Sequence, residues 1–158
     1  MRASVVASGY TNAAFTFGPD QVSNEGSYDA MVVMITSGGI PSKAVSFGGG
    51  GDDRFNALVA NADGIVAVGR TDGNVTIGSE MLVGGGGLDA GAVKLSAADL
   101  SPIWARGAGG IDAQEATSVG VDALDRIAVA GWLKETIDFG TLLTSTGNDD
   151  AFLIQLTP

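Results

Sequence analysis

Three aspartates recur at one place in a repeated pattern, and their carboxylates could hold a cation. Asp29, Asp89 and Asp150 each precede an Ala and an apolar segment, and each follows a turn that contains Gly. Ca²⁺ takes carboxylate and carbonyl oxygens, so these turns are candidate calcium sites, and no other cofactor is predicted. The carboxylates that could add ligands are Asp52, Asp53 and Asp149. An Asp in such a turn also accepts hydrogen bonds from turn N–H groups, and we favour this structural role.

The residue that follows the closing Gly of the repeated apolar segment differs among the three repeats, although the residues around it are nearly constant. Tyr10, Arg70 and Trp132 each directly follow the Gly that closes an apolar segment. Tyr, Arg and Trp dominate the energetic centres of binding interfaces, so the three positions are candidate contacts to a ligand, either a protein or a glycan. The alternative is that they are ordinary strand-end residues that pack over the edge of a sheet.

The inventory of reactive side chains argues against catalysis. The chain contains no His and no Cys, which removes the Ser–His–Asp triad, the thiolate nucleophile and the zinc–thiolate site. The glutamates Glu25, Glu80, Glu115 and Glu135 fall at unrelated positions of the repeated pattern, so no pair of them is forced together. We therefore predict no catalytic residues and no enzyme activity in this chain.

The charge balance bears on the partners of the chain. It has 18 Asp plus Glu against 8 Lys plus Arg, a formal net charge of −10. Such a charge repels a phosphate backbone, so we expect no nucleic acid partner. No stretch approaches the roughly 18 apolar residues of a membrane-spanning helix. Residues 1–10 hold one Arg and a very short apolar run, so we predict no membrane insertion and no signal peptide in this chain.

One unit of about 60 residues occurs three times. Segments 5–9, 65–69 and 127–131 read VVASG, IVAVG and IAVAG, and their final glycines are 60 and 62 residues apart. Each segment is followed, in the same order, by an apolar–Gly pair, a further Gly, an Asp–Ala pair and another apolar segment. Because such anchors define a repeat architecture, we read the chain as one array with repeats at approximately 1–42, 43–101 and 102–158.

The segments within a unit are typical of β-strands. They are short, rich in Val, Ile and Ala, and separated by clusters of Gly, Asp, Asn and Ser. One unit predicts four antiparallel strands, with 116–123 innermost and buried on both sides, 126–133 next, 151–157 third and a strand like 102–109 outermost. Residues 136–150 predict a long loop between the second and third strands. The predicted fold is all-β, a partial β-propeller of three consecutive four-stranded antiparallel blades, of which the first and last are incomplete.

Two stretches carry a likeness to a known family: FGGGGDDRFNALVANADGIVAVG (47–69) and WLKETIDFGTLLTSTGNDDAFLIQL (132–156). The repeat resembles the SBBP-type β-propeller repeats of secreted bacterial proteins, over the whole chain. The resemblance implies an extracellular or cell-surface location and a non-catalytic scaffold or binding module of an exported bacterial protein. The alternative is a fragment of a propeller-containing hydrolase or lyase whose catalytic residues lie outside this chain. Three incomplete blades cannot close a ring, so either the chain is a fragment of a longer array or copies of it associate to complete a ring. We favour the fragment, with neighbouring propeller repeats as partners.

Two further expectations concern packing and a competing fold. Alternation along the strands predicts that the blades pack through Val66, Val68, Val93, Leu95, Ile127, Val129, Leu153 and Trp104. The run GGGGDD at 48–53 is similar to the GGxGxD unit of calcium-binding β-rolls. Those rolls need tandem copies, and the run occurs once, so we prefer the propeller repeat.

Overall fold

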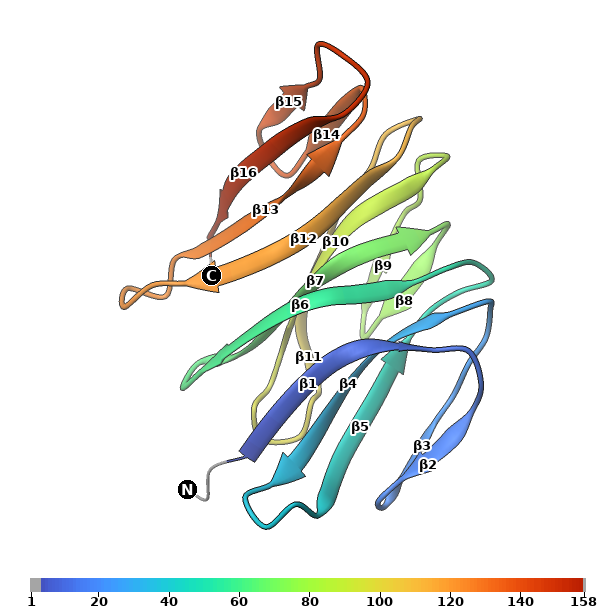
Figure 1. Cartoon of the computed structure of the whole chain (residues 1–158), viewed down its shortest axis with the longest axis vertical. Coiled ribbons are helices and arrows are strands. Elements are labelled where there is room, and N and C mark those ends of the chain that lie inside the picture. Colours follow the sequence, from blue (N-terminus) through green and yellow to red (C-terminus); the bar gives the residue numbers. More distant parts are fainter. Residues whose placement is uncertain (1–3, 158) are drawn as a thin grey trace.

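The computed structural model describes residues 4–157, and every helix or strand in this range is a β-strand (Figure 1). Ten strands of seven to nine residues build three antiparallel sheets, and six strands of three residues pair into three hairpins. The sheets follow one another in chain order and lie side by side. The prediction of an all-β fold is confirmed for the described residues.

The three sheets share one order of strands. The first sheet pairs β1 (Ser4–Thr11), β4 (Asp29–Thr36) and β5 (Pro41–Phe47) in that order. The second pairs β6 (Arg54–Asn61), β7 (Gly64–Asp72), β10 (Leu88–Leu95) and β11 (Pro102–Ala108). The third pairs β12 (Gln114–Val121), β13 (Ile127–Leu133) and β16 (Asp150–Leu156). The second sheet therefore has the four predicted strands in the predicted order, whereas the described residues give the first sheet no counterpart of β6 and the third no counterpart of β11.

With strands numbered by their counterparts in the second sheet, so that β1 and β13 count as second strands like β7, three short hairpins occupy the segments between the second and third strand of each sheet. They are β2–β3 (Phe15–Phe17 and Asp20–Val22), β8–β9 (Val75–Ile77 and Glu80–Leu82) and β14–β15 (Thr136–Asp138 and Leu142–Thr144). Each turn contains a glycine at positive φ, namely Gly18, Gly78 and Gly140. The prediction of an uninterrupted loop at 136–150 is therefore wrong, because three-residue strands are too short to show the period of two that identifies a strand in sequence.

The strands predicted to be innermost, β6 and β12, are edge strands of their sheets. Both are only partly buried, whereas β7 and β10 are buried along almost their whole length. The expectation of burial on both sides of the innermost strand is thus wrong. Strands β7 and β10 have a hydrogen-bonded partner on each side and a sheet over each face, and an edge strand lacks one of those partners.

Two apolar cores lie between the sheets, and β7 contributes to both. Ile65 and Ala67 join the core against the first sheet, and Val66 and Val68 join the core against the third. This alternation follows from the strand's period of two. Strand β6 contacts β1 and β12 directly, while β8 of the hairpin β8–β9 contacts both β5 and β11. The hairpin thus packs between the outer strands of neighbouring sheets, and it adds Val75, Ile77 and Leu82 to the first core.

The predicted core is correct at most positions and wrong at one. The buried positions are Val66, Val68, Val93, Leu95, Ile127 and Val129, and Trp104 is partly buried against the second core. Leu153, in contrast, is 73% exposed. The equivalent residues Val32 and Ala92, each three positions after the repeated Asp, are 0% exposed because a following sheet covers them. No sheet among the described residues covers that face of the third sheet.

Candidate functional site

The three candidate ligand contacts lie at equivalent places in their sheets. In the register between the second and third strands, they stand opposite the Ala that follows each repeated Asp: Tyr10 opposite Ala30, Arg70 opposite Ala90 and Trp132 opposite Ala151. Tyr10 is 46% exposed, whereas Arg70 and Trp132 are half-buried. The structure brings Tyr10 and Arg70 into one polar network, through two residues that the sequence analysis did not connect to them.

Arg54 joins the first sheet to the second. Its guanidinium carbon lies 4.3 Å from the ring centre of Tyr10 and 4.4 Å from that of Tyr28. The two rings meet edge to face, with centres 5.3 Å apart. Nε and Nη2 of Arg54 donate to the two carboxylate oxygens of Asp52 at 2.5 and 2.8 Å. A planar cation that stacks on rings and binds a carboxylate through two N–H groups is a role that Lys could not fill.

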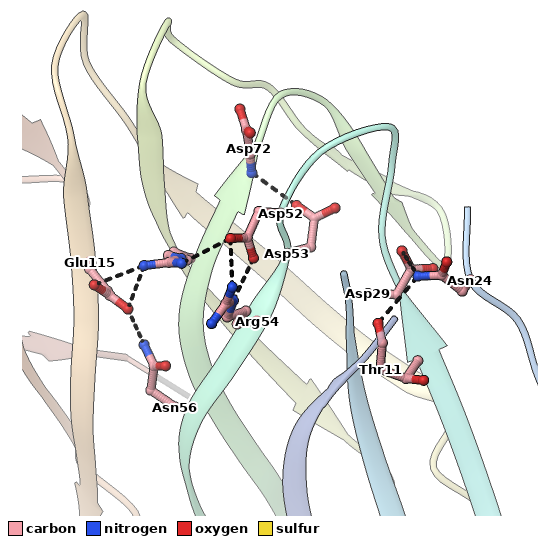
Figure 2. Close-up of polar contacts among 10 residues, drawn as sticks. Thr11, Asn24, Asp29, Asp52, Asp53, Arg54, Asn56, Asp72 and Glu115 are labelled. Atoms are coloured by element: carbon pink, nitrogen blue, oxygen red, sulfur yellow. Dashed lines mark hydrogen bonds and ion pairs between the residues drawn. The ribbon is translucent and has the colours of Figure 1, made fainter. Parts of the chain in front are cut away.

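Asp52 and Glu115 extend this network to the third sheet. Nη2 of Arg70 lies 3.1 Å from Oδ2 of Asp52, and Nη1 lies 3.4 Å from Oε1 of Glu115. Asn56 donates from Nδ2 to Oε1 of Glu115 at 2.8 Å and to the carbonyl of Ala116 at 2.9 Å. A continuous series of contacts therefore runs from the ring of Tyr10 to the third sheet, and Figure 2 shows its part between Arg54, Asp52 and Glu115.

Arg54 and Asp52 each stabilise the charged form of the other. The hydrogen bond from Arg54 holds the pKa of Asp52 below its ordinary value, although burial acts in the opposite direction. The same bond raises the pKa of Arg54. Both groups are therefore charged near neutral pH, and neither is poised to transfer a proton. The network holds neighbouring sheets together through charged and cation–π contacts. This agrees with the alternative interpretation, in which Tyr10 and Arg70 are strand-end residues that pack at the edge of a sheet. Ligand binding by Tyr10, Arg70 and Trp132 stays a prediction.

The repeated aspartates accept hydrogen bonds from backbone N–H groups. In each copy, Oδ2 accepts from the N–H four residues earlier, at 3.0 Å from Glu25, 2.8 Å from Gly85 and 2.7 Å from Thr146. Within residues 4–157, no group of three His, Cys, Asp or Glu side chains is placed to hold a metal ion. A cation at Asp29, Asp89 or Asp150 would have to compete with these donors. Calcium binding at the three turns stays a prediction.

A further buried aspartate, in addition to Asp29 and Asp89, anchors the connection between the first and second sheets. Asp53 is 0% exposed and accepts from Gly49 N at 2.8 Å and from Asp72 N at 2.9 Å. Gln114, also 0% exposed, stands at the equivalent position as the first residue of β12 and accepts from Gly110 N at 3.1 Å. Burial raises the pKa of Asp53 and that of Asp89, because the charged carboxylate loses water.

An open groove that the sequence analysis missed lies between the hairpin β8–β9 and the turn of the hairpin β14–β15. Its volume is about 440 Å³, and Met81, Val83, Arg106, Asp138 and Phe139 contribute to its lining. Met81 and Val83 are 59% and 64% exposed. The guanidinium carbon of Arg106 lies 4.9 Å from the ring centre of Trp104. The signal in the sequence is a departure from the repeat, because Val45 occupies the place of Arg106 in the first sheet.

Comparison with known proteins gives no relative: the sequence matches no protein-family model and no curated protein. Within residues 4–157, no helix is long and apolar enough to cross a membrane.

Proposed function

We propose that the chain forms three consecutive blades of a β-propeller array and serves as a non-catalytic scaffold or binding module of an exported bacterial protein, outside the cell or at its surface. Its partners in this role are neighbouring repeats and a protein or glycan. The proposal joins the all-β architecture to the resemblance with SBBP-type repeats. In this role the repeated sheets position surface loops, and no residue of the chain acts on a substrate.

The observation that supports the scaffold is a contact between neighbouring sheets that recurs at equivalent positions, once as a cation–π contact and once as an ion pair. A residue at the end of the second strand meets a residue of the first strand of the next sheet: Tyr10 stacks on Arg54, and Arg70 pairs with Glu115. The register agrees, because Arg54 pairs with Arg70, and Glu115 pairs with Trp132, inside their own sheets. Contacts between the same two positions at each junction of neighbouring units are what a linear array of stacked repeats requires.

The groove at Met81 and Phe139 supports the binding part of the proposal. It combines exposed apolar side chains with Arg106 and Asp138 at one opening. Apolar surface with a few polar groups that fix orientation is typical of ligand sites. Arg106 over Trp104 adds a flat cationic surface of the kind that recognises sugars or peptide side chains.

Appending a further copy of residues 43–101 behind residue 158 tests the scaffold. The added unit should raise the melting temperature, because each new neighbour adds one interface. The control carries the same copy with its Ile65 changed to Asp, which blocks the face that packs on the preceding sheet. An unchanged melting temperature for the unmodified copy, or an equal rise for the control, would contradict the stacked array.

Tryptophan fluorescence tests the binding module. The chain has two Trp, so Trp132→Phe leaves Trp104, beside the groove, as the single reporter. Titration with cello-, chito- and manno-oligosaccharides and with a mixed peptide library should shift its emission. The shift should disappear in Arg106→Ala and persist in Arg126→Ala, which removes an exposed Arg outside the groove. No shift with any probe would remove the binding part and leave the scaffold untouched.

A further inference from the structure

The outward face of the third sheet is an uncovered copy of a face that is buried elsewhere in the protein. Ala130 pairs with Leu153 and Ala128 with Gln155 across β13 and β16, and paired residues share one face of a sheet. Leu153 is 73% exposed. In the second sheet the equivalent pairs are Val68 with Ala92 and Val66 with Lys94. Val66, Val68 and Ala92 are buried there, in the core against the third sheet.

The outward face of the first sheet is equivalent to the face of the second sheet that packs on the first. Val5 pairs with Ile35 and Ala7 with Val33, and Val5 is 62% exposed. The equivalent pairs of the second sheet are Ile65 with Leu95 and Ala67 with Val93. All four of those residues are 0% exposed, in the core against the first sheet. The first sheet thus presents the kind of face that, inside the chain, receives the sheet before it.

We propose that a second copy of this chain docks head to tail, its first sheet packing on the third sheet of the first copy. The contact continues the interface that the sheets already form twice within one chain, between the same equivalent positions. Both faces are uncharged at these positions (Val5, Ala7, Val33 and Ile35 on one, Ala128, Ala130, Leu153 and Gln155 on the other), so these eight positions bring no like charges together.

The two faces differ, so the contact is heterologous. Each copy keeps one face open after pairing, and the assembly grows to a ring or a filament according to whether its rotation closes. The inference rests on the proposed stacked array. The two can fail separately, because appending a repeat measures stability within one chain, whereas the test below measures association between chains.

The test is sedimentation velocity on the whole chain over a range of concentrations. Leu153→Asp and Val5→Asp each place a charge on one end face, and each should raise the dissociation constant about tenfold or more, since a buried charge without a partner is costly. The matched controls are Leu124→Asp, at a Leu that is also 73% exposed but lies in the turn after β12, and Ile111→Asp, at an Ile that is 76% exposed and lies between β11 and β12. Both controls should associate like the unmodified chain.

Mixing the two end variants identifies the geometry. Val5→Asp keeps an intact third sheet and Leu153→Asp an intact first sheet, so an equimolar mixture should form a one-to-one dimer that neither variant forms alone. Formation of that dimer also shows that both variants are folded. If either aspartate lowers the melting temperature, the serine variants at the same positions carry the same test. A monomeric unmodified chain at every concentration, equal losses in Leu124→Asp and Leu153→Asp, or a mixture that stays monomeric would overturn the proposal.

Discussion

Arg70 of β7 and Glu115 of β12 bridge the second and third sheets, with Nη1 of the arginine 3.4 Å from Oε1 of the glutamate. Tyr10 holds the place of Arg70 in the first sheet, and Arg54 holds the place of Glu115 in the second. The two junctions between sheets therefore use the same pair of positions. One junction stacks a cation on an aromatic ring, and the other forms an ion pair.

The glycines that close the second strands mark a close approach to the first strand. A Cβ on Gly69 would lie 1.9 Å from the carbonyl oxygen of Arg54, and one on Gly131 would lie 2.0 Å from that of Glu115. At Gly9 the nearest atom would be 3.9 Å away, since the described residues hold no strand on that side. In urea denaturation, Gly69→Ala and Gly131→Ala should lose about 1–3 kcal/mol or more of unfolding free energy. Gly9→Ala should change it by less than about 0.5 kcal/mol, and equal losses at all three sites would contradict the repeat register.

Asp89 should make stability fall as the pH rises through the acid range. Burial raises its pKa above the ordinary 3.8, so the folded state holds the proton more tightly than the unfolded state. This stabilisation is complete below pH 3.8 and is lost as the pH rises through the raised folded pKa. The unfolding free energy of the unmodified chain, minus that of Asp89→Asn, should therefore decline with rising pH and then level off. Urea titrations between about pH 3 and pH 7 measure it.

Asp52 provides the control with the opposite sign. Its pKa lies below the ordinary 3.8 because Arg54 donates hydrogen bonds to it. The stabilisation is present above pH 3.8 and is lost as the pH falls through the lowered folded pKa. The difference between the unmodified chain and Asp52→Asn should grow with rising pH. Slopes of the same sign at Asp52 and Asp89 would show that one of the two environments is misassigned.

Truncation of two leucines should cost very different amounts of unfolding free energy, because one leucine lies between sheets and the other on an uncovered face. Leu95 is 0% exposed, and Leu95→Ala should cost about 2–5 kcal/mol of unfolding free energy. Leu153 is 73% exposed, and Leu153→Ala should cost less than about 0.5 kcal/mol. Thermal and urea unfolding at low protein concentration, where chains do not associate, provide the comparison. A large loss at Leu153 would mean that a segment of the chain covers that face in solution.

The strand order of the second sheet could be predicted because the anchors recur at fixed spacing. Leu153 could not be placed correctly from its own strand, since its pattern equals that of Ala92 and only the neighbouring sheet differs. The short hairpins could not be predicted for a different reason: their strands of three residues are too short to show the alternation of apolar and polar residues. Local pattern therefore identified the sheets, and exposure depended on which sheet has a neighbour.

The candidate site was predicted in part. Tyr10, Arg70 and Trp132 were singled out because they vary at a constant position, and two of them lie in the cross-sheet network. Their partners, Arg54 and Glu115, escaped because residues of unlike charge at equivalent positions give no repeated signal. The signal that could have identified them is complementarity between the residue after the closing Gly of one unit and the residue near the start of the first strand of the next, as in Arg70 and Glu115.

Transplanting one junction onto the other tests most directly the claim that the sheets are equivalent stacked repeats. Arg70→Tyr with Glu115→Arg installs the Tyr–Arg pair of the first junction at the second. Each single change removes the ion pair, and Glu115→Arg also opposes two cations. Arg126→Tyr with Glu115→Arg is the control and should be additive, because Arg126 lies at the other end of the sheet, before β13. Double-mutant cycles in urea should give a favourable coupling of about 1 kcal/mol for the transplanted pair, whereas a coupling of zero or an unfavourable one would contradict the equivalence of the two junctions.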